Sequence, residues 1–142
     1  MLAALLVAAT VSVGACDLAA AQTVVDDVND HRVQARERPL VIDPQLTAVA
    51  MDRAADLLRH HYFAHVGPDG TTALDALRSR DFRFSYAGEN LAEAGSIQAA
   101  ELGLWDSPDH RENILERHYR RIGIAVVRTA DNVQFIVQIF TD

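Results

Sequence analysis

The sequence predicts a single α+β layered domain in which four or five helices precede two or three antiparallel strands. Asp43-Pro44 and Ser107-Pro108 each place a favoured N-cap residue before a proline, which is a start signal for a helix. Near the end of the chain, runs 122–127 and 133–140 are rich in β-formers and enclose a turn-like segment, which indicates a hairpin. A chain of 142 residues is long enough for one such domain with its own core.

The first stretch differs from the rest in composition. Residues 2–15 are continuously apolar or small, which is the length of a signal-peptide core and short for a bilayer span, although no lysine or arginine precedes them. The end of this leader offers two candidate processing sites. Val13-Gly-Ala-Cys16 resembles a lipoprotein box with Cys16 as the lipidated residue, whereas Ala19-Ala-Ala-Gln22 resembles an ordinary cleavage site. We therefore expect a leader over residues 1–22 and a folded domain over 23–142; a buried N-terminal helix is the alternative.

Charge and cysteine content restrict the partners. The formal net charge of −7 argues against a nucleic-acid partner and against attraction to an anionic membrane surface. Contact with a membrane would then depend on a lipid anchor at Cys16. Because Cys16 is the only cysteine, the domain has no intrachain disulfide and depends on its core. We expect an exported protein, either secreted or anchored to the outer side of the cell membrane.

The remaining elements follow from periodicity and capping. After the leader, the spacing of apolar residues predicts a helix over 23–36, and the helix that begins at Asp43 carries an apolar stripe through residues 46–58. Thr72 and Asp75 resemble a capping box for a short helix, and Ser96 is placed to cap a helix that reaches Trp105. A short strand is predicted over 89–94, and a helix from Ser107 to about residue 116.

His110 is the most informative candidate site residue. With Ser107 as N-cap it is the third residue of its helix, where the helix dipole disfavours a charged imidazolium. A neutral imidazole is what a metal ligand or a general base requires. The alternative is that His110 assists capping or packs against Trp105.

Glu89 and His65 are the other candidates. Glu89 follows Ala87-Gly88 in an apolar neighbourhood, where a carboxylate needs a partner or takes a raised pKa; it could instead bond to the backbone of a turn. His65 lies between a helix and the turn Gly67-Pro-Asp-Gly70, a loop position that favours a site. We expect Arg53 and Arg111 to anchor carboxylates within the fold.

Taken together, these segments resemble the bacterial branch of the CAP superfamily, whose members are also called SCP-like domains. The resemblance covers nearly the whole chain after the leader and rests on several ordered motifs, namely Tyr62-Phe-Ala-His65, Gly67-Pro-Asp-Gly70, Ala87-Gly-Glu-Asn-Leu91, Trp105-x-Ser-Pro-x-His-Arg-x-Asn-Ile-Leu115 and Ile122-Gly123. It implies a three-layer α-β-α sandwich with a small antiparallel sheet flanked by helices.

The resemblance also implies a cleft of two histidines and two glutamates that binds a divalent metal such as zinc in some members. His65, Glu89 and His110 correspond to three of these residues, whereas Pro108 stands where eukaryotic relatives have the second glutamate. Glu101 and Glu112 are the carboxylates that could substitute for it. Two histidines and one carboxylate suffice for zinc with an open position when they converge.

Three functions are compatible with this interpretation. The leading hypothesis is an exported binding module whose cleft of His65, Glu89 and His110 holds a divalent metal or a small ligand. The second is a metal-dependent hydrolase in which the metal activates water. The third is an envelope protein that works through surface contacts with a lipid or protein partner, with the cluster serving the fold alone. We lean against an enzyme because fold does not dictate function and no nucleophile motif is present.

Overall fold

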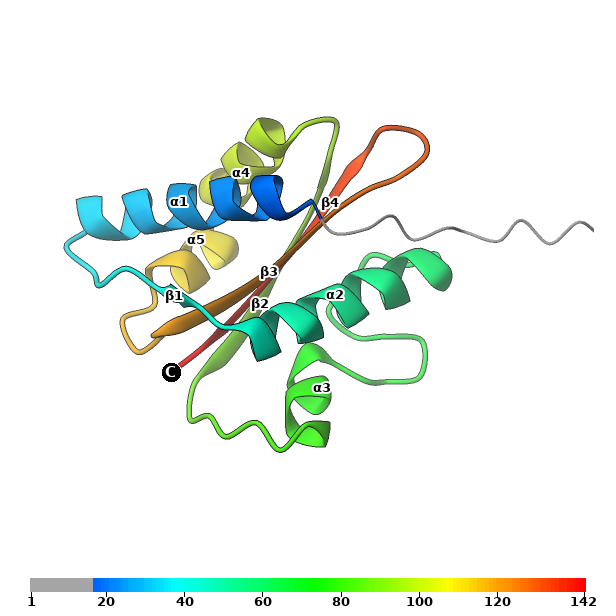
Figure 1. The fold of residues 1–142 in the computed structure, drawn as a ribbon, viewed down its shortest axis with the longest axis horizontal. Coiled ribbons are helices and arrows are strands. Elements are labelled where there is room, and N and C mark those ends of the chain that lie inside the picture. The colour runs from blue at the N-terminus through cyan, green and yellow to red at the C-terminus, as the bar shows by residue number, and fades with distance from the viewer. Residues whose placement is uncertain (1–16) are drawn as a thin grey trace, which may run out of the picture.

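In a computed structural model, described for residues 17–142, five helices and four strands form a three-layer α-β-α sandwich, which confirms the predicted fold class (Figure 1). Cys16 and the apolar stretch before it lie outside the described residues. In chain order the elements are α1 (Leu18–Gln34), β1 (Val41–Ile42), α2 (Pro44–Arg59), α3 (Ala73–Ser79), β2 (Ala87–Ala94), α4 (Ile97–Asp106), α5 (Pro108–Leu115), β3 (Arg121–Arg128) and β4 (Gln134–Thr141).

The central sheet has the strand order β1-β3-β4-β2. As predicted, β3 and β4 form an antiparallel hairpin, and β2 joins the other side of β4, also antiparallel. The prediction of a purely antiparallel sheet is incomplete, because the two-residue strand β1 pairs with β3 in parallel. A strand of two residues is too short to carry an alternating pattern, so no local signal indicated it.

Both faces of the sheet are covered, which explains why β3 and β4 are almost continuously apolar. In β3, Ile122, Ile124 and Val126 pack toward α1, α4 and α5, while the alternate residues Ala125 and Val127 pack toward α2 and α3. Figure 1 shows these two helical layers on opposite sides of the sheet. The period of two along each strand therefore decides which layer a side chain enters.

The helix starts confirm most of the capping predictions. Asp43 accepts hydrogen bonds from two backbone N–H groups at the start of α2, and Thr72 forms a complete capping box with Asp75 at α3. Ser96 caps α4. Ser107 precedes α5 as predicted but makes no side-chain capping bond there, so Pro108 alone provides the start signal.

The first helix differs from its predicted start. It begins at Leu18 rather than Thr23, and Asp17 caps it by accepting a hydrogen bond from the backbone N–H of Ala20 at 3.0 Å. Ala20 is buried in the core, and the backbone N–H of Asp17 donates to the carbonyl oxygen of Val126 in β3. The first turn of α1 is thus attached to the sheet.

Among the helices of residues 17–142, none combines the length and the apolar character that crossing a membrane would require.

Candidate functional site

The candidate site lies at the free edge of the sheet, where β2 meets the loop after α2 and the first turn of α5. Glu89 projects from β2 toward the α2 layer, His65 comes from the loop, and His110 comes from α5. The structure therefore brings together the three residues that the sequence singled out. Each of the three side chains therefore depends on a different part of the fold: a paired strand for Glu89, a loop for His65 and a helix start for His110.

Glu89 is the buried centre of this site. It is 8% exposed, and each of its carboxylate oxygens has a partner. The guanidinium of Arg53 donates to one oxygen through Nε at 2.9 Å, and the ring of His65 lies 2.8 Å from the other through Nδ1. Since a carboxylate only accepts, His65 Nδ1 is the donor, and the neutral ring in this tautomer has its lone pair on Nε2. Glu89 thus orients His65 with Nε2 available to a ligand.

Arg53 ties the loop that carries His65 to α2. Its guanidinium also donates to the carbonyl oxygens of Ala64 and His65, at 2.9 and 2.8 Å, and to the hydroxyl of Tyr62. Tyr62 in turn donates to Asp56. Burial alone would lower the pKa of Arg53, but the hydrogen bond and charge of Glu89 raise it above the ordinary value. The prediction that Arg53 anchors a carboxylate is confirmed.

His110 faces His65 across the site, with 6.4 Å between the ring centroids. It occupies the third position of α5, as predicted. Its pKa is lowered, first by burial and then by the nearby His65, while Asp109 acts in the opposite direction. The direction of this pKa shift agrees with the predicted neutral state near pH 7, and burial is its largest cause.

A network of side-chain amides, which the sequence analysis missed, holds α5 against β2. Asn90 donates to the carbonyl oxygen of His110 at 3.1 Å and to Gln138 on β4 at 3.0 Å. Asn113 donates to Asn90 at 2.9 Å and to the carbonyl oxygen of Glu89 at 3.3 Å. As β2 is an edge strand, Asn113 satisfies a backbone acceptor that has no neighbouring strand. In the sequence, the signal available for this network was the asparagine that ends each of the segments Gly88-Glu-Asn90 and Arg111-Glu-Asn113.

Replacement of Asn90 by leucine should lower the free energy of unfolding by about 1 to 3 kcal/mol, because it leaves buried amide partners unsatisfied. Asn90 is fully buried, and its partners lie on two different elements, α5 and β4. Urea denaturation at pH 7 measures the effect. Gln45, an exposed amide in the first turn of α2, offers the control, for which replacement by leucine should have a much smaller effect. Equal stability of the two variants would contradict the network's role.

One alternative and one expectation about the surroundings of the site are wrong. Trp105 stacks with His31, at 3.7 Å between ring centroids, so His110 is not its aromatic partner. Arg111 was expected to anchor a carboxylate, but it donates to the carbonyl oxygen of Trp105 at 3.0 Å and lies over the indole ring. The first contact joins α1 to α4, and the second joins α5 to α4 around the turn at Ser107, so neither follows from the pattern of a single helix.

Neither substitute carboxylate joins the cluster. Glu101 lies on α4, on the opposite side of the sheet from Glu89, where it contacts Gln138. Glu112 is exposed on α5. Burial, with a contribution from the charge of Asp27, raises the pKa of Glu101 to about 8.

This raised pKa predicts a stability effect of known sign. Because the folded protein keeps the proton on Glu101 between about pH 4.5 and pH 8, the protein loses stability as the pH rises through this window. Replacement by the uncharged, isosteric Gln in E101Q should raise Tm at pH 8.5 relative to the native chain, and should have little effect at pH 4.5. Thermal denaturation at the two pH values measures this. A Tm difference that does not depend on pH would contradict it.

A metal ion requires several donor atoms that point to one position. Among residues 17–142, no group of three or more His, Cys, Asp and Glu side chains is arranged to hold a metal ion. Both oxygens of Glu89 are already engaged, which suits a carboxylate that orients a ligating histidine better than one that ligates. The imidazoles of His65 and His110 are nevertheless chemically suited to zinc. If a metal ion binds here, these two residues would be its first ligands, with Glu89 behind them.

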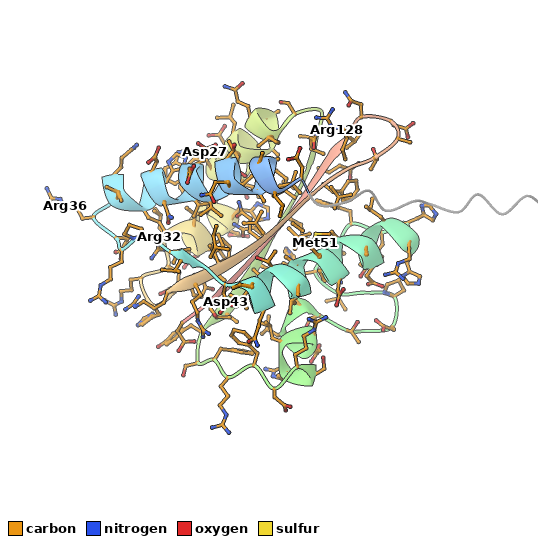
Figure 2. The ribbon with its side chains drawn as sticks, in the orientation of Figure 1. Asp27, Arg32, Arg36, Asp43, Met51 and Arg128 are labelled. Atoms are coloured by element: carbon orange, nitrogen blue, oxygen red, sulfur yellow. The ribbon has the colours of Figure 1, made fainter. Side chains whose placement is uncertain are left out.

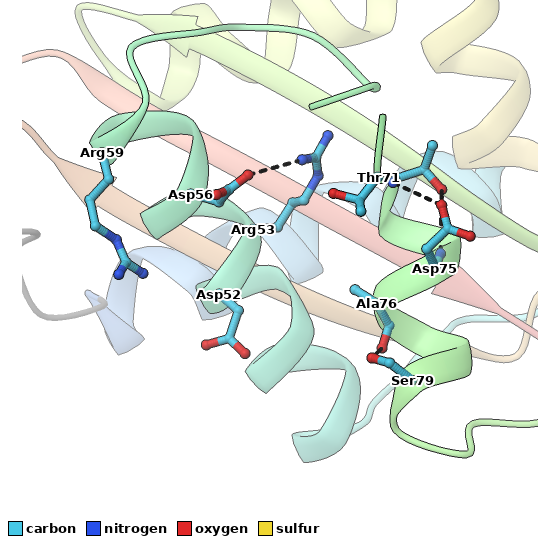
Figure 3. Close-up of a pocket in the computed structure, with 9 residues that line it drawn as sticks. Asp52, Arg53, Asp56, Arg59, Thr71, Asp75, Ala76 and Ser79 are labelled. Atoms are coloured by element: carbon cyan, nitrogen blue, oxygen red, sulfur yellow. Dashed lines mark hydrogen bonds and ion pairs between the residues drawn. The ribbon is translucent and has the colours of Figure 1, made fainter. Parts of the chain in front are cut away.

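Two adjacent depressions extend from the site. One, of about 300 Å³, is lined by His65, Glu89 and the start of α3. The other is a groove of about 450 Å³ between α2 and α3, shown in Figure 3. Thr72 lines both, and the groove adds the polar side chains Asp52, Arg53, Asp56, Arg59, Thr71, Asp75 and Ser79. The site therefore opens onto a polar surface large enough for a small ligand.

The fold and the site define a class of small α-β-α sandwich proteins with a histidine and glutamate cleft at a sheet edge. The family model described as CAP, the cysteine-rich secretory protein family, matches residues 25–140. The chain belongs to this family.

Relatives and solved structures agree with this assignment. The chain is 30% identical to YkwD of Bacillus subtilis (strain 168) over 107 residues, which covers 75% of this chain and 42% of YkwD. An extracellular SCP-domain protein from Bacillus anthracis is 30% identical, with a TM-score of 0.77 over 87% of this chain and 40% of that chain. An outer surface protein from Borrelia burgdorferi has the same fold, with a TM-score of 0.82 at 23% identity over 87% of this chain and 92% of that chain. The chain thus spans less than half of the length of the two Bacillus proteins.

Proposed function

We propose that this protein is an exported binding module whose cleft holds a divalent metal ion, such as zinc, through His65 and His110. The observation that carries the proposal is the pair formed by His65 and Glu89, at 2.8 Å between Nδ1 and Oε1. A carboxylate behind a histidine fixes the tautomer and leaves Nε2 free, which is the arrangement found behind metal-ligating histidines. The lowered pKa of His110 supports the proposal, because it keeps the second imidazole unprotonated at neutral pH.

The geometry favours binding over hydrolysis. A metal-dependent hydrolase usually needs a carboxylate free to take a proton from water. Here Arg53 holds Glu89 from one side and His65 from the other, so this carboxylate is committed to orienting its neighbours. The adjacent polar groove between α2 and α3 supplies space for a small ligand next to the metal.

Export is supported by the apolar leader and by the named location of the relatives. The Bacillus anthracis protein is described as extracellular, and the Borrelia burgdorferi protein as an outer surface protein.

Of the two candidate processing sites at the end of the leader, the start of α1 favours the one before Asp17. Cleavage within Ala19–Gln22 would remove the capping residue Asp17 and buried Ala20 from the helix. We therefore propose lipidation at Cys16, which would anchor the domain to the outer side of the membrane.

Zinc titration by calorimetry at pH 7 tests the cleft. We expect one site with a Kd of about 1 μM or tighter, and no measurable binding by the His110→Ala variant. His61→Ala is the matched control, because His61 is an exposed histidine of the same loop region and should leave binding unchanged. A native chain that takes up no zinc would refute the metal site. Unfolding of both the His65→Ala and the His110→Ala variants would instead show that the cluster is structural.

A further inference from the structure

An open depression with several polar side chains in its lining lies on the opposite side of the sheet from the His65 and His110 cleft. It has a volume of about 240 Å³ and is lined by Asp27 and His31 of α1 and by Gln98, Glu101, Leu102 and Trp105 of α4. Figure 2 shows Asp27 on the side of α1 that borders α4. A water molecule takes up about 30 Å³, so the cavity can hold a ligand of several heavy atoms rather than a single ion.

Glu101 is a buried carboxyl group in this cavity, and one of its oxygens has no protein partner. It is 8% exposed, and Gln138 donates to its Oε1 at 3.3 Å. Within residues 17–142 its other oxygen, Oε2, takes part in no hydrogen bond and no ion pair. A buried carboxyl group without a cation is costly as a carboxylate, and this cost raises its pKa to about 8. A positively charged ligand that pairs with Glu101 would instead stabilise the carboxylate form.

The remaining walls are also suited to a cation. Asp27 supplies a second carboxylate, and Gln98 an amide oxygen at the rim. The indole of Trp105, which stacks on His31 at an interplanar angle of 8°, and the side chain of Leu102 provide apolar surface. Arg111 lies over the indole ring and donates to the carbonyl oxygen of Trp105, and within residues 17–142 it forms no ion pair with Glu101 or Asp27. Three oxygen acceptors beside apolar surface match the three donors and the alkyl stem of an ammonium group.

We infer that the cavity between α1 and α4 is a binding site for a primary alkylammonium ion, such as the side chain of a lysine. The ammonium group pairs with Glu101 and Asp27, and its stem lies along Trp105 and Leu102. On binding at neutral pH, the Glu101 carboxyl group loses its proton to the buffer and becomes the carboxylate that pairs with the cation. A planar guanidinium, which needs a bidentate carboxylate, fits this arrangement less well.

Fluorescence of Trp105, the only tryptophan of the sequence, reports on this cavity directly. The full chain is titrated with n-butylammonium chloride at pH 7.5 and constant ionic strength. We expect a saturable change with a Kd of about 1 mM or tighter, and at least tenfold weaker binding of n-butylguanidinium and of neutral n-butanol. Binding of all three probes with equal affinity would show an apolar pocket and overturn the inference. A titration without saturation would overturn it as well.

Two variants separate this site from a general effect. E101Q and D27N should each weaken butylammonium binding at least tenfold, while His110→Ala should leave it unchanged because the metal cleft lies across the sheet. Calorimetry in buffers of different ionisation enthalpy should detect proton release on binding to the native chain and none with E101Q. D27N changes a half-exposed residue, so it tests the site even when E101Q folds poorly. Unchanged affinity in D27N and in a folded E101Q would refute the proposal.

Discussion

Replacement of Arg53 by methionine is expected to lower the free energy of unfolding by about 3 to 5 kcal/mol, the range found when one partner of a buried ion pair is removed. Arg53 is 5% exposed and is the cation that compensates Glu89. Methionine fills much of the same volume but leaves the Glu89 carboxylate with His65 alone. It also releases the carbonyl oxygens of Ala64 and His65. Urea denaturation at pH 7 measures the loss.

The same helix provides the control for this prediction. Arg59 is exposed and bonds only within α2 through the carbonyl oxygen of Ala55, so Arg59→Met should change the unfolding free energy by less than about 0.5 kcal/mol. A double variant that also carries Glu89→Gln should be more stable than Arg53→Met alone, because the unpaired buried charge is gone. A loss below about 1 kcal/mol for Arg53→Met would show that the pair has little effect on folding.

Replacement of Gly123 by alanine should destabilise the domain by about 3 kcal/mol or more, beyond the usual cost of overpacking a core. Gly123 lies in β3 on the face that receives α2, and a Cβ atom there would overlap the backbone of Leu46 and Thr47. Backbone atoms cannot rotate away as a side chain can, so the start of α2 would have to move off the sheet. Thermal denaturation should show a large fall in Tm.

Gly103 gives the opposite expectation. It is an exposed residue within α4, and a Cβ atom there meets no other atom within 4 Å. Gly103→Ala should therefore raise stability by up to about 1 kcal/mol through helix propensity. A Gly123→Ala variant as stable as the native chain would contradict the close approach of α2 to the sheet.

Local sequence signals predicted much of the fold. The starts of α2, α3 and α4 depend on residues within three positions of one another, such as Asp43 with the N–H groups of Gln45 and Leu46, so they can be read without knowledge of the rest of the chain. The β3–β4 hairpin was visible for the same reason. The start of α1 was missed, because the small residues around Ala20 have the composition of a cleavage site as well as that of a helix.

The sequence by itself determined the fold class, the starts of α2 to α5, the family and the chemical identity of the candidate residues His65, Glu89 and His110. Only the tertiary structure decided that these residues meet, that Arg53 pairs with Glu89 across 36 positions of sequence, and that Glu101 lies on the other side of the sheet. The physical reason is range: capping and periodicity act within a few residues, whereas burial and ion pairing depend on which segments the sheet places side by side.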